Sequence, residues 1–275
     1  MATDYSIADQ TARFENAKAT KDERYLNIGS VFDPKFFAGK RVVVTGGNRG
    51  LGLEITKRAA ASGAEVIVLC RKFGPELDGI ATAYDGVDVT DMDAINTWRV
   101  VSEKGPIDVL INNAGYFYGP SESVMEGTLN FEEQLKQINI CAIGPLRVTS
   151  ALVQAGGLLP GSRAVVITSQ AGSVEWRFTQ NPEGGDYGHH MSRAACNIMA
   201  ALLAQELKSK GVSVVLLHPG FNKTEMTAKY SHIWEIEGAV DASDGAMRVL
   251  HEVAGADMDK TGKFINCEDG KEIPW

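Results

Sequence analysis

Residues 41–52 of the chain read RVVVTGGNRGLG. The β-branched run at 42–44 predicts a buried strand, and the spacing of Leu51, Ile55 and Ala59 predicts a helix directly after the glycines. Glycines between a strand and a helix permit a tight turn and a close approach of the backbone to a ligand. The free N–H groups at the start of the helix then offer a site for a diphosphate. This stretch therefore predicts a nucleotide-binding loop.

The alternation of strand-like and helix-like stretches continues along the chain. Further strands are expected over residues 66–69, 86–89, 108–111, 164–167, 212–217 and 264–266, and helices over 91–101, 131–154 and 189–209. Strands that are apolar throughout and alternate with helices indicate a parallel sheet covered on both faces. Right-handed crossovers make such a sheet doubly wound. The sequence thus predicts an α/β fold: a single doubly wound Rossmann-type parallel sheet of about seven strands with helices on both faces.

No shift in composition divides the chain, so residues 39–275 are expected to form one dinucleotide-binding catalytic domain. Residues 1–38 are polar, show no sustained periodicity and are expected to be an N-terminal extension that contacts a neighbouring subunit. Ligands of doubly wound sheets bind beyond the carboxyl ends of the strands, where the strand order reverses. The loops after the strands are therefore the places where the chemistry is expected.

Charge and composition exclude several classes of protein. With 27 Lys and Arg against 35 Asp and Glu, the net charge of −8 argues against a nucleic-acid partner. No apolar run approaches the roughly 18 residues of a membrane span, and residues 1–24 lack the apolar core of a secretory signal. The four cysteines are far apart, which favours reduced thiols over disulfides or a metal site. We expect a cytoplasmic protein without membrane, nucleic-acid or metal partners.

The end of the expected second strand bears on the choice of nucleotide. A carboxylate there would bind the adenosine ribose of NAD and repel a 2′-phosphate. Residues 66–72 read VIVLCRK and contain no acid. Arg71 and Lys72, together with Arg49 in the glycine loop, offer cations for the additional phosphate of NADP. The alternative is that all three are solvated surface cations, but the missing acid and the arginines together predict NADP(H).

Several further motifs make the chain resemble the short-chain dehydrogenase/reductase family. They are TGGNRGLG at 45–52, Asp88 in DVTD, NNAG at 112–115, Asn139 in a long helix, Ser169 in TSQAG, and Pro219-Gly220 with Thr224. The ending GKFINCEDGKEIPW and the helix motif MSRAACNIM are most similar to the carbonyl-reductase branch that includes the C-factor and sniffer types. The resemblance covers residue 40 to the C-terminus.

This resemblance implies a role for each matching residue. The cofactor would be bound by Gly46, Asn48, Arg49, Gly50, Leu51, Gly52, Arg71, Asp88, Val89, Asn113, Ala114, Gly115, Arg193, Pro219, Gly220 and Thr224. Ser169 would donate a hydrogen bond to the substrate carbonyl, and Asn139 would position a water molecule. Simpler readings stay open, because Ser169 and Thr224 are also suited to capping a turn or helix, and Asn139 to satisfying backbone groups.

The chain departs from the family at its Tyr-x-x-x-Lys pair. Aligning MSRAA at 191–195 with the family's helix places Arg193 at the lysine and His189 at the tyrosine. Residues 189 and 193 share a helix face, whereas Tyr187 does not share it, so Tyr187 is an alternative only if the chain there is still a loop. Imidazole exchanges protons near neutrality, so His189 is suited to proton transfer. Arginine stays protonated, so no proton relay can run through position 193.

These residues predict an NADP(H)-dependent oxidoreductase that transfers a hydride between nicotinamide and a carbonyl or alcohol substrate, with Ser169, His189, Arg193, Asn139 and Tyr187 as candidate catalytic residues. The competing hypothesis is a catalytically weak or inactive NADP(H)-binding sensor or interaction protein on the same fold. Because the family commonly forms dimers or tetramers, the resemblance also implies a homodimer or homotetramer.

Overall fold

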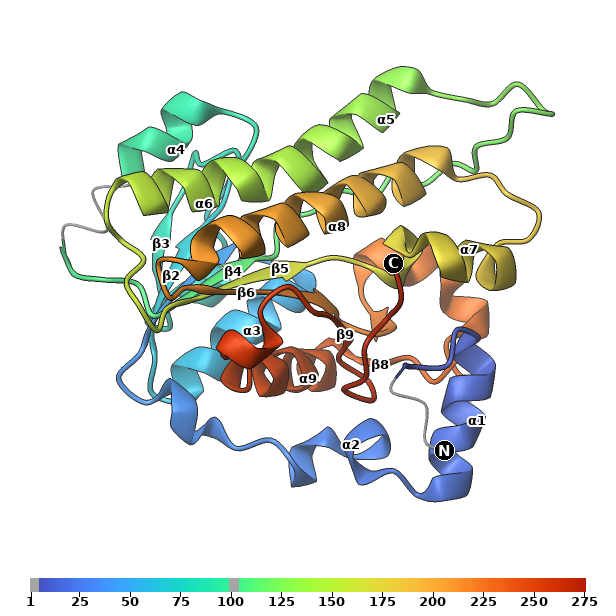
Figure 1. Ribbon diagram of the computed structural model, residues 1–275, viewed down its shortest axis with the longest axis horizontal. Helices are drawn as coiled ribbons and strands as arrows, with labels where there is room; N and C mark the ends of the chain where they lie inside the picture. Colours follow the sequence, from blue (N-terminus) through green and yellow to red (C-terminus); the bar gives the residue numbers. More distant parts are fainter. Residues whose placement is uncertain (1–4, 99–103) are drawn as a thin grey trace.

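A seven-stranded parallel sheet forms the centre of the molecule (Figure 1). The computed structural model describes residues 5–98 and 104–275. The strand order is β3-β2-β1-β4-β5-β6-β9. From β1 the chain adds β2 and β3 on one side of the sheet and then crosses over to add β4 on the other side, so the strand order reverses between β1 and β4. The strands are β1 (Arg41–Thr45), β2 (Glu65–Leu69), β3 (Thr82–Tyr84), β4 (Val109–Asn112), β5 (Arg163–Ile167), β6 (Ser213–His218) and β9 (Phe264–Asn266). The predicted doubly wound Rossmann-type fold is confirmed.

Helices cover both faces of this sheet, as Figure 1 shows. On one face lie α3 (Gly50–Ala61) and α9 (Ala242–Ala254), and on the other lie α4 (Met92–Trp98), α5 (Phe131–Ile138), α6 (Gly144–Gln154) and α8 (Tyr187–Lys208). Successive side chains of a strand point to opposite faces. Accordingly, Val42 and Val44 pack into the core beneath α3, whereas Val43 packs into the core with residues of α6 and α8. All three are fully buried, which explains the unbroken apolar run of β1.

Shorter elements connect these layers. They are η1 (Ile28–Ser30), η2 (Pro34–Phe37), η3 (Pro75–Leu77), η6 (Gln170–Gly172), α7 (Val174–Gln180), β7 (Asn222–Lys223), η7 (Glu225–Ile233), β8 (Val240–Asp241) and η8 (Met258–Lys260). Between α5 and α6 the chain forms a π-helical turn, η5 (Asn139–Ile143), so the helix predicted over 131–154 is continuous but irregular. Among the described helices we find no candidate for a membrane-spanning segment.

Three predicted elements differ from the structure by more than one residue at a boundary. The third strand is at Thr82–Tyr84 and not at 86–89, because Gly86 adopts a left-handed φ of 70° and turns the chain after the strand. The helix predicted at 91–101 is α4, and residues 99–101 lie outside the described residues. The helix predicted from residue 189 begins two residues earlier, at Tyr187.

The N-terminal extension is helical and packs on its own chain; its contact with a neighbouring subunit stays a prediction. It forms α1 (Gln10–Thr20) and α2 (Glu23–Leu26), followed by η1 and η2 (Figure 1, blue). Tyr25, Ile28 and Phe37 are buried, and Arg248 of α9 donates a hydrogen bond to the carbonyl of Tyr25. Apolar periodicity does not reveal α1, because the side chains that it buries include Gln10 and Arg13.

Candidate functional site

The glycine loop leaves the carboxyl end of β1 and leads into α3. Gly46 has a left-handed φ of 66°, and a Cβ atom there would lie 3.1 Å from the Cα atom of Ala114. Gly52 lies in the first turn of α3, where a Cβ atom would lie 2.2 Å from the carbonyl oxygen of Gly46 and 2.4 Å from Nδ2 of Asn113. Only glycine fits so close an approach. The N-terminus of α3 is thereby packed against the turn, with its free N–H groups at the edge of the sheet.

Hydrogen bonds join this loop to the turn that follows β4. Asn113 donates from Nδ2 to the carbonyl oxygens of Thr45 and Gly46, at 3.1 and 3.2 Å. The hydroxyl of Thr45 accepts from the backbone N–H groups of Asn113 and Ala114, both at 3.0 Å. The ends of β1 and β4 therefore form one rigid unit. The remaining loop side chains are more open: Asn48 donates to the carbonyl of Lys72, and the exposed Arg49 lies 4.0 Å from Glu225.

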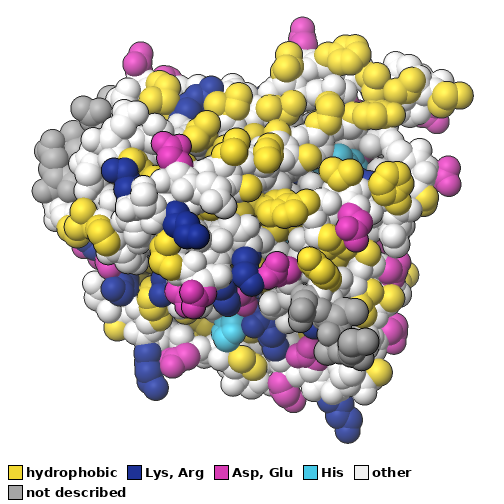
Figure 2. Space-filling view, in the orientation of Figure 1, with side chains coloured by type: hydrophobic (Ala, Val, Ile, Leu, Met, Phe, Trp, Pro, Cys, Tyr) yellow, Lys and Arg dark blue, Asp and Glu magenta, His cyan; other side chains and the backbone are white. Residues whose placement is uncertain are grey.

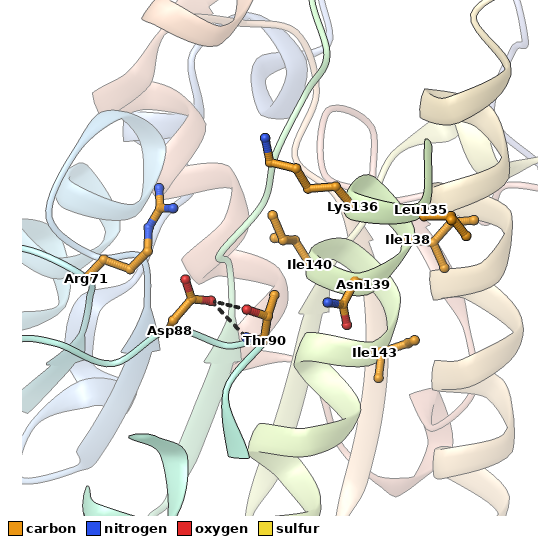
Figure 3. Close-up of a pocket in the computed structure, with 9 residues that line it drawn as sticks. All are labelled: Arg71, Asp88, Thr90, Leu135, Lys136, Ile138, Asn139, Ile140 and Ile143. Atoms are coloured by element: carbon orange, nitrogen blue, oxygen red, sulfur yellow. Dashed lines mark hydrogen bonds between the residues drawn. The ribbon is translucent and has the colours of Figure 1, made fainter. Parts of the chain in front are cut away.

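A cavity of about 470 Å³ lies between the segments that follow β2 and β3 on one side and α5 with the π-helical turn on the other (Figure 3). It is lined by Arg71, Asp88, Thr90, Leu135, Lys136, Ile138, Asn139, Ile140 and Ile143. Asp88 accepts hydrogen bonds from the N–H and hydroxyl of Thr90, at 2.9 and 2.8 Å, and Arg71 stands on the same side of the cavity, as Figure 3 shows. Val89 instead packs against Gly144 of α6. Apolar walls with a few fixed polar groups are typical of a small-molecule site.

Ser169 follows β5 and lies beside the middle of α8. Its hydroxyl accepts a hydrogen bond from the N–H of Ala171 at 3.1 Å, and its proton has no acceptor among the described residues. The adjacent Thr168 donates to Oδ1 of Asn197 at 2.6 Å, and a Cβ atom on Gly172 would lie 2.6 Å from the backbone of Arg193. The turn that carries Ser169 is therefore held tightly against α8.

The guanidinium of Arg193 lies between the ends of β4 and β5. The residue is only 7% exposed. Nη1 lies 3.5 Å from the carbonyl oxygen of Ile167, and Nη2 lies 3.4 Å from the position of a Cβ atom on Gly115. Nε is buried without a hydrogen-bond partner among the described residues. A buried N–H donor without an acceptor costs free energy. A buried guanidinium with unused donors is therefore suited to bind a ligand that offers several oxygen acceptors.

His189 precedes Arg193 by one turn of α8. Its ring packs edge-on against Phe117, with ring centroids 4.8 Å apart and an interplanar angle of 76°. The Nδ1 atom is buried and unpartnered within the described part of the chain. Burial, and then the charge of Arg193 and the neighbouring His190, hold the pKa of His189 well below its ordinary value of 6.5. The imidazole is therefore neutral at pH 7, and in this form it is suited to accept a proton.

The other predicted residues lie at or near this edge of the sheet. Tyr187 is the first residue of α8 and is 38% exposed, so the loop that its alternative role required is absent here. Asn139 lies in the π-helical turn, and its Oδ1 accepts from Arg147 at 2.7 Å. Thr224 is the N-cap residue of η7, and its backbone N–H donates to the hydroxyl of Thr227 at 3.1 Å. Pro219 and Gly220 directly follow β6.

The family model for short chain dehydrogenase matches residues 40–233. The chain belongs to the short-chain dehydrogenase family. Proteins of this family are oxidoreductases, so the chain is placed among enzymes at the level of its family.

Individual relatives resemble this short-chain dehydrogenase over most of their length. The C-signal protein of Myxococcus xanthus is 34% identical over 173 residues, which are 62% of this chain and 94% of that protein. A 1-hydroxy-2-glutathionyl-2-methyl-3-butene dehydrogenase of Rhodococcus is 29% identical over 82% of this chain and 98% of that protein. Carbonyl reductase Sniffer of Drosophila melanogaster shares the fold, with a TM-score of 0.71 at 21% identity over 86% of this chain and all of that one.

One contact that orders the candidate site has no signal in the sequence. Glu122, in the long connection after β4, is buried, and its Oε2 atom accepts from the N–H of Gly188 at 2.6 Å. Asp186 precedes α8 but makes no side-chain cap, so Glu122 takes this role at the positive end of the helix dipole. It thereby fixes the turn of α8 that carries His189. A partner 66 residues away cannot be found from local motifs.

Proposed function

We propose that this short-chain dehydrogenase is an NADP(H)-dependent oxidoreductase that transfers a hydride between nicotinamide and a carbonyl or alcohol substrate, with residues 39–275 as its catalytic domain. The observation that carries the proposal is the gathering of the tight glycine loop, Ser169 and Arg193 at the carboxyl ends of β1, β4 and β5. A Burkholderia cenocepacia short chain dehydrogenase solved in complex with NADP supports it, with 26% identity and a TM-score of 0.69 over 85% of this chain and 98% of that one.

The close contacts at Gly52 and the unused donors of Arg193 fit a dinucleotide. The diphosphate would lie on the N-terminus of α3, at Gly46, Asn48, Gly50, Leu51 and Gly52. The adenine would occupy the cavity at Asp88, next to Val89, and the residues 113–115 would border the ribose that Arg193 holds. Pro219, Gly220 and Thr224 would border the nicotinamide. When bound, the cofactor supplies or accepts the hydride.

The chain's own groups would manage the oxygen and the proton of the substrate. Ser169 donates its free hydroxyl proton to the substrate oxygen. His189, as a neutral imidazole, takes the proton of an alcohol during oxidation, and it must first be protonated to serve carbonyl reduction. Arg193 keeps its proton, so the proton leaves His189 without passing through residue 193. In this proposal Asn139, held by Arg147, has a structural role.

The low pKa of His189 predicts that the two directions of the reaction depend differently on pH. Above pH 6.5 the protonated fraction of this imidazole falls, so kcat/KM for carbonyl reduction should drop by about tenfold per pH unit between pH 6.5 and 8.5. Alcohol oxidation should stay level over the same range, because the base is already neutral. Both profiles are measured with one substrate pair. A reduction rate that does not change with pH would rule out His189 as the donor.

Arg71 is expected to select NADP over NAD. It is exposed and lines the cavity that contains Asp88, where a 2′-phosphate would lie. Arg71→Ala should weaken NADPH binding by about tenfold or more, while NADH binding changes by less than about twofold. Fluorescence titration with each coenzyme measures both affinities. Equal losses for the two coenzymes would contradict a contact between Arg71 and the 2′-phosphate.

The second candidate function is an NADP(H)-binding sensor that does little or no chemistry. It is favoured by the neutral state of His189 and by the exposed position of Tyr187. Incubation of the protein with NADPH and a panel of aldehydes, ketones and quinones separates the two functions. The enzyme predicts turnover that Ser169→Ala reduces. The sensor predicts tight binding of NADPH, no turnover, and no effect of the same substitution.

Exposed apolar side chains support a homodimer or homotetramer. They gather along α5, the π-helical turn after it, α6 and α8, and Figure 2 shows them as a yellow band over these helices. The exposed residues are Phe131, Leu135, Ile143, Leu146, Met191, Ile198 and Leu202. Contiguous apolar surface of this kind commonly marks a protein interface.

The four cysteines are buried and free, which supports the expected reducing, cytoplasmic location.

A further inference from the structure

A buried ion pair joins the N-terminal segment to the end of the sheet. Arg13 of α1 is only 2% exposed, and its Nε atom donates to Oε2 of Glu268 at 2.9 Å. Gln10, on the same helix face, donates to Oε1 of Glu268 at 3.0 Å. Glu268 lies just after β9 and is fully buried. Burial raises the pKa of this carboxyl, but Arg13 and Arg248 outweigh it and hold the value at about 2. Glu268 is therefore ionised throughout the neutral range.

The same pair reaches both loops that flank the proposed nicotinamide position. On one side, Nη2 of Arg13 donates to Oε1 of Gln170 at 2.9 Å, and Gln170 directly follows Ser169. On the other side, Oε1 of Glu268 accepts from the backbone N–H of Phe221 at 3.2 Å. A Cβ atom on Gly220 would lie 2.6 Å from the Cγ atom of Glu268, so this loop rests directly on the carboxylate side chain.

Arg13 thus bridges Glu268 and Gln170. Arginine is suited to this bridge, because its planar guanidinium holds two acceptors at fixed angles. A buried ion pair adds little to stability compared with apolar residues of the same size, so its main effect is on geometry. The family match begins at residue 40, after the segment that supplies Arg13. Both Arg13 and Glu268 therefore lie outside the part of the chain that matches the family model.

We propose that the N-terminal segment, residues 5–38, is an intramolecular clamp in which Arg13 and Glu268 are positioning residues for the turn at Ser169 and the loop at 219–221. This inference rests on the proposed function, since it assumes that these loops enclose the nicotinamide. The clamp fixes the nicotinamide end of the site and leaves the adenosine end, at the glycine loop and Asp88, unaffected.

Arg13→Met tests the clamp, with Arg24→Met as its matched control. Arg24 also anchors the segment, through an ion pair with the buried Glu252 of α9, but it contacts neither loop. Calorimetry measures the binding of NADPH and of 2′-phosphoadenosine 5′-diphosphate, which lacks the nicotinamide. Arg13→Met should weaken NADPH and lower kcat by about tenfold each, while the fragment's affinity changes less than about twofold. Arg24→Met should lower Tm and leave both affinities unchanged.

Gln170→Ala keeps the proposal testable if Arg13→Met does not fold. Gln170 is partly exposed, and its replacement removes the side-chain hydrogen bonds with Arg13 and Gln10 that join the turn at Ser169 to α1. We expect kcat to fall by about fivefold to tenfold with little change in NADPH affinity. The clamp is overturned if both variants match the wild type, or if Arg24→Met has the same effect as Arg13→Met. A wild-type protein that binds neither NADPH nor the fragment overturns the proposed function, and the clamp with it.

Discussion

Gly52→Ala is expected to weaken NADPH binding by at least about a hundredfold, or roughly 2.7 kcal/mol. The added Cβ atom would lie 2.2 Å from the carbonyl oxygen of Gly46 and 2.4 Å from Nδ2 of Asn113, so the loop and the turn after β4 must separate. The N-terminus of α3 would then leave the position in which it can hold a diphosphate. Isothermal titration calorimetry measures the loss.

Gly119→Ala is the control for this substitution. A Cβ atom at Gly119 meets nothing within 4 Å, and NADPH affinity should be unchanged. Circular dichroism checks that Gly52→Ala keeps its helices, which alanine favours over glycine. If a folded Gly52→Ala protein binds NADPH as tightly as the wild type, then the glycine loop does not hold the cofactor.

His189→Ala should reduce kcat by about 10²- to 10⁴-fold, the usual cost of losing a general acid or base. Cofactor affinity should change little, because the ring of His189 contacts Phe117 and His190, and the residues proposed to hold the cofactor remain in place. Steady-state kinetics give kcat, and a parallel titration gives the affinity for NADPH.

Tyr187→Phe is the matched control for His189→Ala. Tyr187 is the first residue of α8, and it does not share the helix face of Arg193. Its loss of a hydroxyl should therefore leave kcat unchanged. A large loss in Tyr187→Phe, together with an active His189→Ala protein, would show that the alignment of the catalytic helix is wrong by two positions.

The central sheet could be predicted because its physical signal is local and strong. Val42, Val43 and Val44 are buried on both faces of the sheet, which leaves an unbroken apolar run in the sequence. The glycine loop could also be predicted, since the close contacts at Gly46 and Gly52 exclude any side chain. Its place between a strand and a helix then located the edge of the sheet at which the candidate site lies.

Apolar spacing does not identify the buried face of α8. Met191, Ile198 and Leu202 follow one another at helical spacing, yet the structure leaves them exposed. The buried side of the helix instead carries Ser192 and Cys196, which are small enough to let α8 approach the sheet and the turn at Ser169. Close packing selects for small side chains, and a pattern of large apolar residues does not report it.

The N-terminal segment could not be predicted for a different reason. Its buried side chains include Gln10 and Arg13, whose partner Glu268 is 258 and 255 residues away. Such a pair is stable only because the fold brings its members together and the hydrogen bonds satisfy both charges. Neither residue carries a local signal for burial. The cap that Glu122 provides for α8 escaped prediction in the same way.

A crystal structure with NADP⁺ bound tests the central claim most directly. We predict that the diphosphate accepts hydrogen bonds from backbone N–H groups of residues 49–52, and that C4 of the nicotinamide faces Ser169 and His189. The adenine should occupy the cavity between Asp88 and Ile138. A dinucleotide bound elsewhere, or one whose nicotinamide points away from Ser169, would contradict the account.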